Sequence, residues 1–210
     1  MTATDRVPGA STTLQPKANA RLRNAVAPMR NNRRMASLLV VTGPPGAGKS
    51  TVARFLAEAF KRSVLVEGDA FFAFLARGAV LPWLPEANDQ NDVVTQAAAS
   101  AAGRYVAGGY NTVYDGVVGP WFLPRFVAAT GLGSVHYVVL LPSAQRCVAR
   151  VVTRPGHGFA DVDATRRMHQ EFTRASIDQR HLMVDPPDEV AAVAERVLAA
   201  VASGELAYRG

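Results

Sequence analysis

The chain has 210 residues, of which 49% are hydrophobic, and carries a formal net charge of +6. This length and composition fit one globular domain with a sizeable core, and no apolar run approaches the roughly 18 residues of a membrane span. The single cysteine, Cys147, excludes an intrachain disulfide, and the chain begins with neither a secretory signal nor a lipidation motif, so we expect a cytoplasmic protein.

Positive charge is concentrated in the first 34 residues, which hold seven Lys and Arg side chains against one Asp. The rest of the chain is therefore electrically balanced. Residues 1–34 lack apolar periodicity, so we expect a flexible basic extension before a single domain of residues 35–210. The extension could lack a specific role, touch nucleic acid or an anionic surface, or precede a true start at Met29 or Met35. Because it has no aromatic residues between its charges, the sequence argues against a nucleic-acid partner.

The first expected strand, 38–42, is short, apolar and β-branched, as in a buried parallel strand. A helix with regularly spaced apolar residues is expected over 50–60. Between them lies a match to the phosphate-loop pattern G-x-x-x-x-G-K-[ST], namely Gly43, Pro44, Pro45, Gly46, Ala47, Gly48, Lys49, Ser50 and Thr51.

The position of this motif between a strand and a helix is the one that its chemistry requires. Its backbone N–H groups and the helix N-terminus would surround a phosphate chain. Lys49 would reach the outer phosphates, and the hydroxyl of Ser50 would bind Mg²⁺. The sequence therefore predicts a site for a nucleoside triphosphate.

Strands and helices alternate through the rest of the chain, which predicts a parallel sheet with helices on both faces. The expected strands are 63–67, 112–115, 135–141 and 181–185. The expected helices are 69–77, 89–108, 120–129, 143–153, 161–181 and 187–203, with a loop over 78–86. Ligands of such sheets bind beyond the carboxyl ends of the strands.

Two aspartates follow strands and so lie at that edge. Asp115 has the position of a carboxylate that holds Mg²⁺ beside Ser50, although an Asp-Gly pair is also a common turn. Asp69 could accept the proton of a hydroxyl that attacks the γ-phosphate. It could equally cap the helix that begins at Ala70, and the two roles are compatible.

Aromatic and basic residues suggest the remaining parts of a site. Three aromatic side chains near the strand ends are candidates to line an acceptor pocket: Phe72, Trp83 and Trp121. Arg150 and Arg154 precede a Gly/Pro/His stretch that could form a short lid over about 154–160, bringing an arginine onto the phosphates. Arg125 and Arg174 are candidates to touch an anionic group of the substrate, although either could be a solvated helix residue.

The phosphate loop, Gly68-Asp69, Asp115-Gly116 and the Arg150/Arg154 pair make the chain resemble the P-loop small-molecule kinases. Shikimate kinase, gluconate kinase and chloramphenicol phosphotransferase share this layout. The resemblance implies a three-layer α/β fold with a five-stranded parallel sheet in the order 2-3-1-4-5, a short lid, and the cofactors ATP and Mg²⁺.

The resemblance also implies roles for single residues. Asp69 would match the aspartate that activates the acceptor, and Arg154 the lid arginine. Arg150 with Pro186 or Pro187 would sandwich the adenine, and Arg174 would match an acceptor-side arginine of shikimate kinase. Shikimate kinase has two aspartates after its second strand and a glycine triplet after its third. This chain has neither, which argues against shikimate as its substrate.

These features predict an ATP- and Mg²⁺-dependent phosphotransferase that acts on a hydroxyl of a small, partly apolar molecule, a metabolite or an antibiotic. One alternative is a kinase of a nucleotide sugar or an RNA end. Another is an ATP-binding switch protein that transfers no phosphate. The sequence leaves the acceptor and the oligomeric state open.

Overall fold

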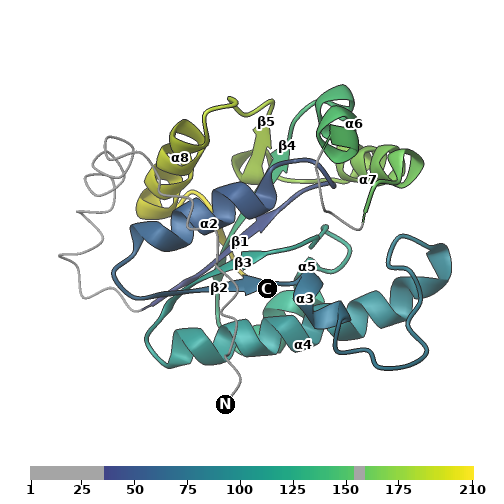
Figure 1. Cartoon of the computed structure of the whole chain (residues 1–210). Coiled ribbons are helices and arrows are strands. Elements are labelled where there is room, and N and C mark those ends of the chain that lie inside the picture. Colours follow the sequence, from purple (N-terminus) through teal and green to yellow (C-terminus); the bar gives the residue numbers. More distant parts are fainter. Residues whose placement is uncertain (1–35, 154–158) are drawn as a thin grey trace, which may run out of the picture.

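The computed structural model describes residues 36–153 and 159–210, which form a sheet between two layers of helices (Figure 1). Its five parallel strands have the order β2-β3-β1-β4-β5. The fold class and the strand order predicted from the sequence are confirmed. The strands are β1 (Leu38–Thr42), β2 (Ser63–Glu67), β3 (Asn111–Asp115), β4 (Val135–Leu141) and β5 (Leu182–Val184).

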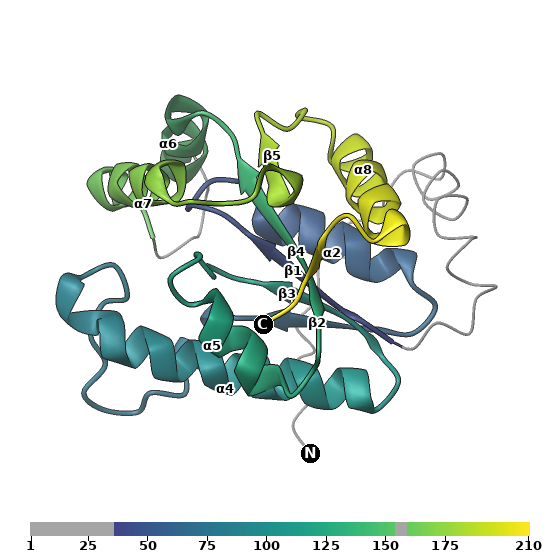
Figure 2. The ribbon, with the colours of Figure 1, turned by 180° about the vertical axis from the view of Figure 1, so that it is seen from behind.

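The helices divide between the two faces of the sheet, and α6 and α7 pack together near the end of β4 (Figures 1 and 2). On one face lie α2 (Lys49–Ala59) and α8 (Val190–Ser203). On the other lie α4 (Asn88–Ala107) and α5 (Leu123–Thr130). The remaining elements are α3 (Asp69–Phe72), α6 (Ala144–Thr153), α7 (Val162–Arg174) and the 3₁₀ turns Pro85–Ala87 and Gln179–His181.

The side chains of β1 point alternately to the two faces of the sheet, which explains why both faces of the sheet are covered by helices. Leu39 and Val41 pack in the core beneath α2 and α8, whereas Leu38 and Val40 pack in the core beneath α4 and α5. All four side chains are buried. Each such side chain contributes about 1.5–3 kcal/mol through burial, so the strand that leads into the phosphate loop is strongly anchored.

A two-residue sixth strand, β6 (Ala207–Tyr208), pairs antiparallel with the beginning of β4. The sequence pattern does not predict it. The ring of Tyr208 lies against the rings of Tyr137 and His181, and His181 Nδ1 is 3.0 Å from the carbonyl oxygen of Tyr137. Burial lowers the pKa of His181, so the neutral imidazole is favoured in this core.

Four helix boundaries differ from the expectation by three residues or more, among them the start of α5, which begins at Leu123 rather than at residue 120. The helix expected over 161–181 ends at Arg174, because Ala175 is extended and its N–H closes the last turn onto the carbonyl of Glu171. The helix expected over 69–77 ends at Phe72, and the closing helix begins at Val190 rather than at residue 187. Within 36–153 and 159–210, no helix combines the length and apolar character that crossing a bilayer requires.

Candidate active site

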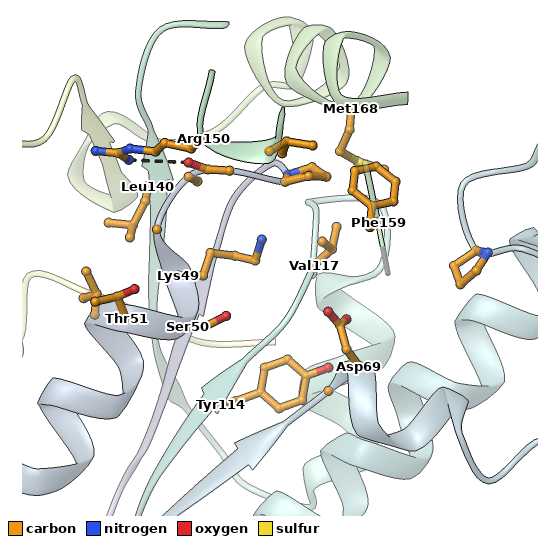
Figure 3. A pocket seen from close by; sticks show the side chains of 18 of the residues that line it. Lys49, Ser50, Thr51, Asp69, Tyr114, Val117, Leu140, Arg150, Phe159 and Met168 are labelled. Atoms are coloured by element: carbon orange, nitrogen blue, oxygen red, sulfur yellow. Dashed lines mark hydrogen bonds between the residues drawn. The ribbon is translucent and has the colours of Figure 1, made fainter. Parts of the chain in front are cut away.

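A cavity of about 660 Å³ lies at the carboxyl ends of β1, β2 and β3, where the sequence places the phosphate loop and Asp69. In Figure 3 the side chains of Lys49 and Asp69 point into it from opposite sides, with Arg150 toward one end and Phe159 and Met168 toward the other. The sequence-predicted residues that line this cavity are residues 45–51 of the phosphate loop together with Asp69, Phe72, Trp83, Trp121, Arg150, Pro186 and Pro187.

The phosphate loop is packed directly against α6. Gly46 has φ +77°, and a Cβ at this position would lie 2.2 Å from the carbonyl oxygen of Cys147. The N–H of Ala47 closes a turn onto the carbonyl of Pro44, and Lys49 Nζ donates to the same oxygen at 3.1 Å. Glycine is therefore required at position 46 both for its backbone angle and for the close approach of two chain segments.

The packed Cys147 should be unreactive while the protein is folded. Burial raises the pKa of its thiol to about 11, although Lys49 and Arg150 oppose the shift. Because the thiolate is the nucleophile, we expect negligible reaction with a disulfide reagent such as DTNB at about pH 8. In urea the chain should release one equivalent of chromophore, since it contains a single cysteine. Rapid stoichiometric release from the folded protein would contradict the packing described here.

Asp69 and Asp115 lie side by side at the strand ends but in different environments. The N–H of Gly68 donates to the carbonyl of Asp115 at 2.7 Å, which ties the end of β2 to the end of β3. Asp69 is exposed, whereas Asp115 is buried behind the cavity wall. Burial raises the pKa of Asp115, while the charge of Lys49 and a hydrogen bond from Ser50 oppose that rise.

The Ser50–Asp115 pair fits Mg²⁺. The buried Oδ1 of Asp115 has no hydrogen-bond partner among the described residues, so one carboxylate oxygen remains available to a ligand. Hydroxyl and carboxylate oxygens are the donors that Mg²⁺ prefers. Within the described part of the chain no three His, Cys, Asp or Glu side chains gather to hold a metal by themselves. This donor set suits an ion that completes its coordination with phosphate oxygens and water.

Tyr114, which the sequence did not single out, lines the cavity beneath Asp69 (Figure 3). Its hydroxyl would lie 2.3 Å from a Cβ on Gly68, so glycine is needed where the chain crosses the ring. Burial and the charges of Asp69 and Asp115 raise the pKa of Tyr114, which keeps the phenol protonated. The sequence contains no sign that Tyr114 lines a cavity. Residues 112–115 of β3 are all buried, so polar and apolar side chains do not alternate in a way that would distinguish the two faces of this strand.

One end of the cavity is built from an arginine–aspartate cluster and two prolines. Arg150 donates to the carbonyl of Gly46 at 3.4 Å and to Asp188 at 2.8 Å. Arg146 also binds Asp188, and this hydrogen bond lowers the pKa of that carboxyl. Pro186, Pro187 and Asp188 line the cavity beside Arg150. The sequence did not point to Asp188, although the i, i+4 spacing of Arg146 and Arg150 hints at a shared partner.

The other end is aromatic. Trp83 meets Phe159 edge to face at 5.0 Å between ring centroids, and Trp121 lies 5.3 Å from the ring of Phe172 on α7. Phe72, Phe122 and Met168 are among the other side chains on this wall.

The loop that carries Trp83 is held onto α4 by two amide side chains. Gln90 exchanges two hydrogen bonds of 2.8 Å with the backbone of Val80, and Asn91 donates to the carbonyl of Pro82 at 2.7 Å. The loop is therefore fixed next to the tryptophan, and Trp83 is held over the cavity.

The two arginines predicted to touch an anionic group of the substrate lie away from this cavity. Arg125 is exposed on α5 and binds Asp92 at 2.9 Å, and Arg174 is exposed at the end of α7. Neither is among the residues that line the cavity. Arg154 and most of the lid expected over 154–160 lie outside the described residues.

Residues 38–193 match the AAA domain family. This chain belongs to that family. Every residue that lines the cavity falls inside the matched range, so the site is part of the AAA domain itself.

A curated relative aligns with a short part of this AAA domain protein. An adenylate kinase of Nocardioides sp. (strain ATCC BAA-499 / JS614) is 46% identical over 43 residues, which is 20% of this chain and 22% of that kinase. The aligned part thus spans about a fifth of the relative's length.

Solved structures share the fold of this AAA domain. A gluconokinase from Sinorhizobium meliloti 1021 gives a TM-score of 0.55 at 22% identity, over 82% of this chain and 97% of that one. The tunicamycin resistance protein of Deinococcus radiodurans gives 0.55 at 18% identity, over 79% and 95%. A chain of an RNA repair complex gives 0.53 at 19% identity, over 69% of this chain but only 46% of that one. At these identities the likeness concerns the fold alone, and it agrees with the fold that the resemblance to P-loop kinases implies.

Proposed function

We propose that this protein is an ATP- and Mg²⁺-dependent phosphotransferase that moves the γ-phosphoryl group onto a hydroxyl of a small, partly apolar molecule. The observation that supports this most is the exposed carboxylate of Asp69, which faces the phosphate loop across one cavity and lies beside an aromatic wall. A nucleotide-binding protein that only switches shape has no need of a carboxylate in that position.

The nucleotide would lie along the phosphate loop. The loop N–H groups and Lys49 would hold the phosphate chain, with Arg150 and Pro187 beside the base. Ser50 and Asp115 would hold Mg²⁺, which when bound neutralises charge on the β- and γ-phosphates.

Asp69 would orient the acceptor and remove its proton. As the acceptor oxygen bonds to the γ-phosphorus, the bond from that phosphorus to the oxygen of ADP breaks, and the proton of the hydroxyl passes to Asp69. The resemblance to P-loop kinases assigns neutralisation of the developing charge to Arg154, which lies outside the described residues.

The test is ADP release from Mg²⁺-ATP in the presence of a panel of hydroxyl-bearing metabolites and antibiotics. We expect at least one acceptor to stimulate release, and the Lys49→Ala variant to lose about a hundredfold or more of the stimulated rate because a preorganised phosphate donor is gone. ATP binding without stimulated turnover by any acceptor would favour the switch protein instead. Stimulation that survives in Lys49→Ala would indicate a contaminating kinase.

A further inference from the structure

We infer that the acceptor is an uncharged molecule that presents an apolar ring to the aromatic end of the cavity. This inference names the substrate class of the proposed function and rests on it. It begins from the distribution of charge around the cavity. Lys49, Arg150 and Asp188 belong to the phosphate loop and the arginine cluster, where the nucleotide would lie. Among the described lining residues of the aromatic end, Asp69 alone is charged.

An anionic acceptor would find no cation among the described residues at this end. A carboxylate or phosphate entering beside Trp83 and Trp121 would lose water without gaining an ion pair, and it would meet the like charge of Asp69. Arg125 and Arg174 do not compensate, since neither lines the cavity and Arg125 is already bound to Asp92.

A cationic acceptor is disfavoured for a different reason. An ammonium group at this end would pair with Asp69, the single described carboxylate there. Such a pair occupies the carboxylate oxygens that must accept the proton of the hydroxyl, which weakens Asp69 as a base. The chemistry therefore needs Asp69 unpaired, and this leaves an uncharged acceptor.

The wall itself suits a flat apolar group. Trp83 is held by its contact with Phe159 and by the Gln90 and Asn91 hydrogen bonds to its loop, while Trp121 lies against Phe172. Aromatic side chains fixed in this way lose little further entropy when a ring lies against them.

The neutral polar groups on this wall can serve the polar atoms of such a molecule. Thr95 and Asn91 line the cavity from α4, and Tyr114 lies beneath Asp69. These groups hydrogen-bond neutral substituents without requiring a charge.

The chain provides its own reporter of acceptor binding, because both of its tryptophans, Trp83 and Trp121, line the cavity. The probes are matched pairs of aryl alcohols that differ only in charge, beginning with 4-(hydroxymethyl)benzamide and 4-(hydroxymethyl)benzoate. Each is titrated into the full chain with Mg²⁺-ADP, and the tryptophan fluorescence is recorded. We expect the amide of each pair to bind about tenfold or more tightly than the carboxylate.

Equal or tighter binding of the carboxylates would overturn the inference, and so would a failure of every neutral probe to change the fluorescence. The same probes are then tested for ADP release from Mg²⁺-ATP. A neutral probe that binds without turnover counts against the phosphotransferase and leaves the charge selectivity standing. A carboxylate that is phosphorylated efficiently supports the phosphotransferase and refutes the uncharged acceptor.

A positive charge placed at the aromatic end of the cavity should weaken the preference for the uncharged probe over the carboxylate. Met168→Arg adds a cation at the aromatic end, whereas Gln170→Arg adds the same charge on an exposed part of α7 that does not line the cavity. We expect Met168→Arg to tighten binding of the benzoate by about fivefold or more and Gln170→Arg to leave it unchanged. No difference between the two variants, with both folded by circular dichroism, would contradict the placement of the acceptor.

Discussion

Asp69→Asn is expected to abolish acceptor phosphorylation while ATP still binds. The amide keeps the size of the carboxylate but cannot accept the proton of the attacking hydroxyl, and a general base typically contributes about 10²–10⁴-fold to the rate. Asp69 is exposed, and it is the first residue of α3, whose N-cap is Gly68, rather than the cap expected before a helix at Ala70, so the fold should be unaffected. The measurements are the acceptor-stimulated rate of ADP release and the affinity for ATP.

The matched control is Asp89→Asn, which removes an exposed carboxylate from the first turn of α4. Asp89 does not line the cavity, so this variant should keep the wild-type rate. A rate in Asp69→Asn within about threefold of the wild type would remove Asp69 from the role of base. Loss of ATP affinity in the same variant would instead place this carboxylate in nucleotide binding.

Gly46→Ala is expected to destabilise the protein and to eliminate nucleotide binding. The methyl group would lie 2.2 Å from the carbonyl oxygen of Cys147, and the backbone has φ +77°. Left-handed strain costs about 1–2 kcal/mol and overpacking about 1–3 kcal/mol, so the free energy of unfolding should fall by roughly 2–5 kcal/mol. For a chain of this size the melting temperature should drop by about 10 °C, as measured by calorimetry.

The Gly109→Ala variant separates backbone strain from overpacking as causes of the loss of stability. Gly109 has φ +82°, but nothing beyond its chain neighbours lies within 4 Å of the position that a methyl group would take, so this variant carries the backbone strain without the clash. It should cost about 1–2 kcal/mol and leave ATP affinity unchanged. Equal losses of stability in the two variants would show that the loop can move away from α6, contrary to the packing described above.

The first four strands were predictable because each is a short run that contains β-branched residues and is bounded by turn residues. β1, β2 and β4 begin and end where the sequence indicates, and β3 and β5 differ by a residue or so. The helix over 161–181 was extended too far because Ala175 and Ser176 carry no stop signal comparable to glycine or proline. β6 could not be foreseen, since two residues have no periodicity and its pairing depends on the register of β4.

The sequence predicted those site residues whose positions follow from a local motif. It did not predict those that tertiary packing brings to the site from distant parts of the chain. The phosphate loop, Asp69 and the two tryptophans could be placed from strand ends and loop chemistry. Asp188 could not, because its partners Arg146 and Arg150 come from a helix some 40 residues earlier in the chain. The sequence also could not distinguish the candidate arginines that line the cavity from those that are solvated, because both kinds have the same local sequence.

The contrast between the exposed Asp69 and the buried Asp115 has a consequence for repeated turnover. A carboxylate that faces open water exchanges protons with the solvent directly, so a base in the position of Asp69 returns to its starting state without a relay of buried side chains. Asp115 is shielded from bulk water; its burial raises the pKa of the carboxyl, and the charge of Lys49 and the Ser50 hydrogen bond oppose that rise. The fold thus separates an aspartate that exchanges protons with water from one that is shielded from water, although the ends of their strands are hydrogen-bonded neighbours.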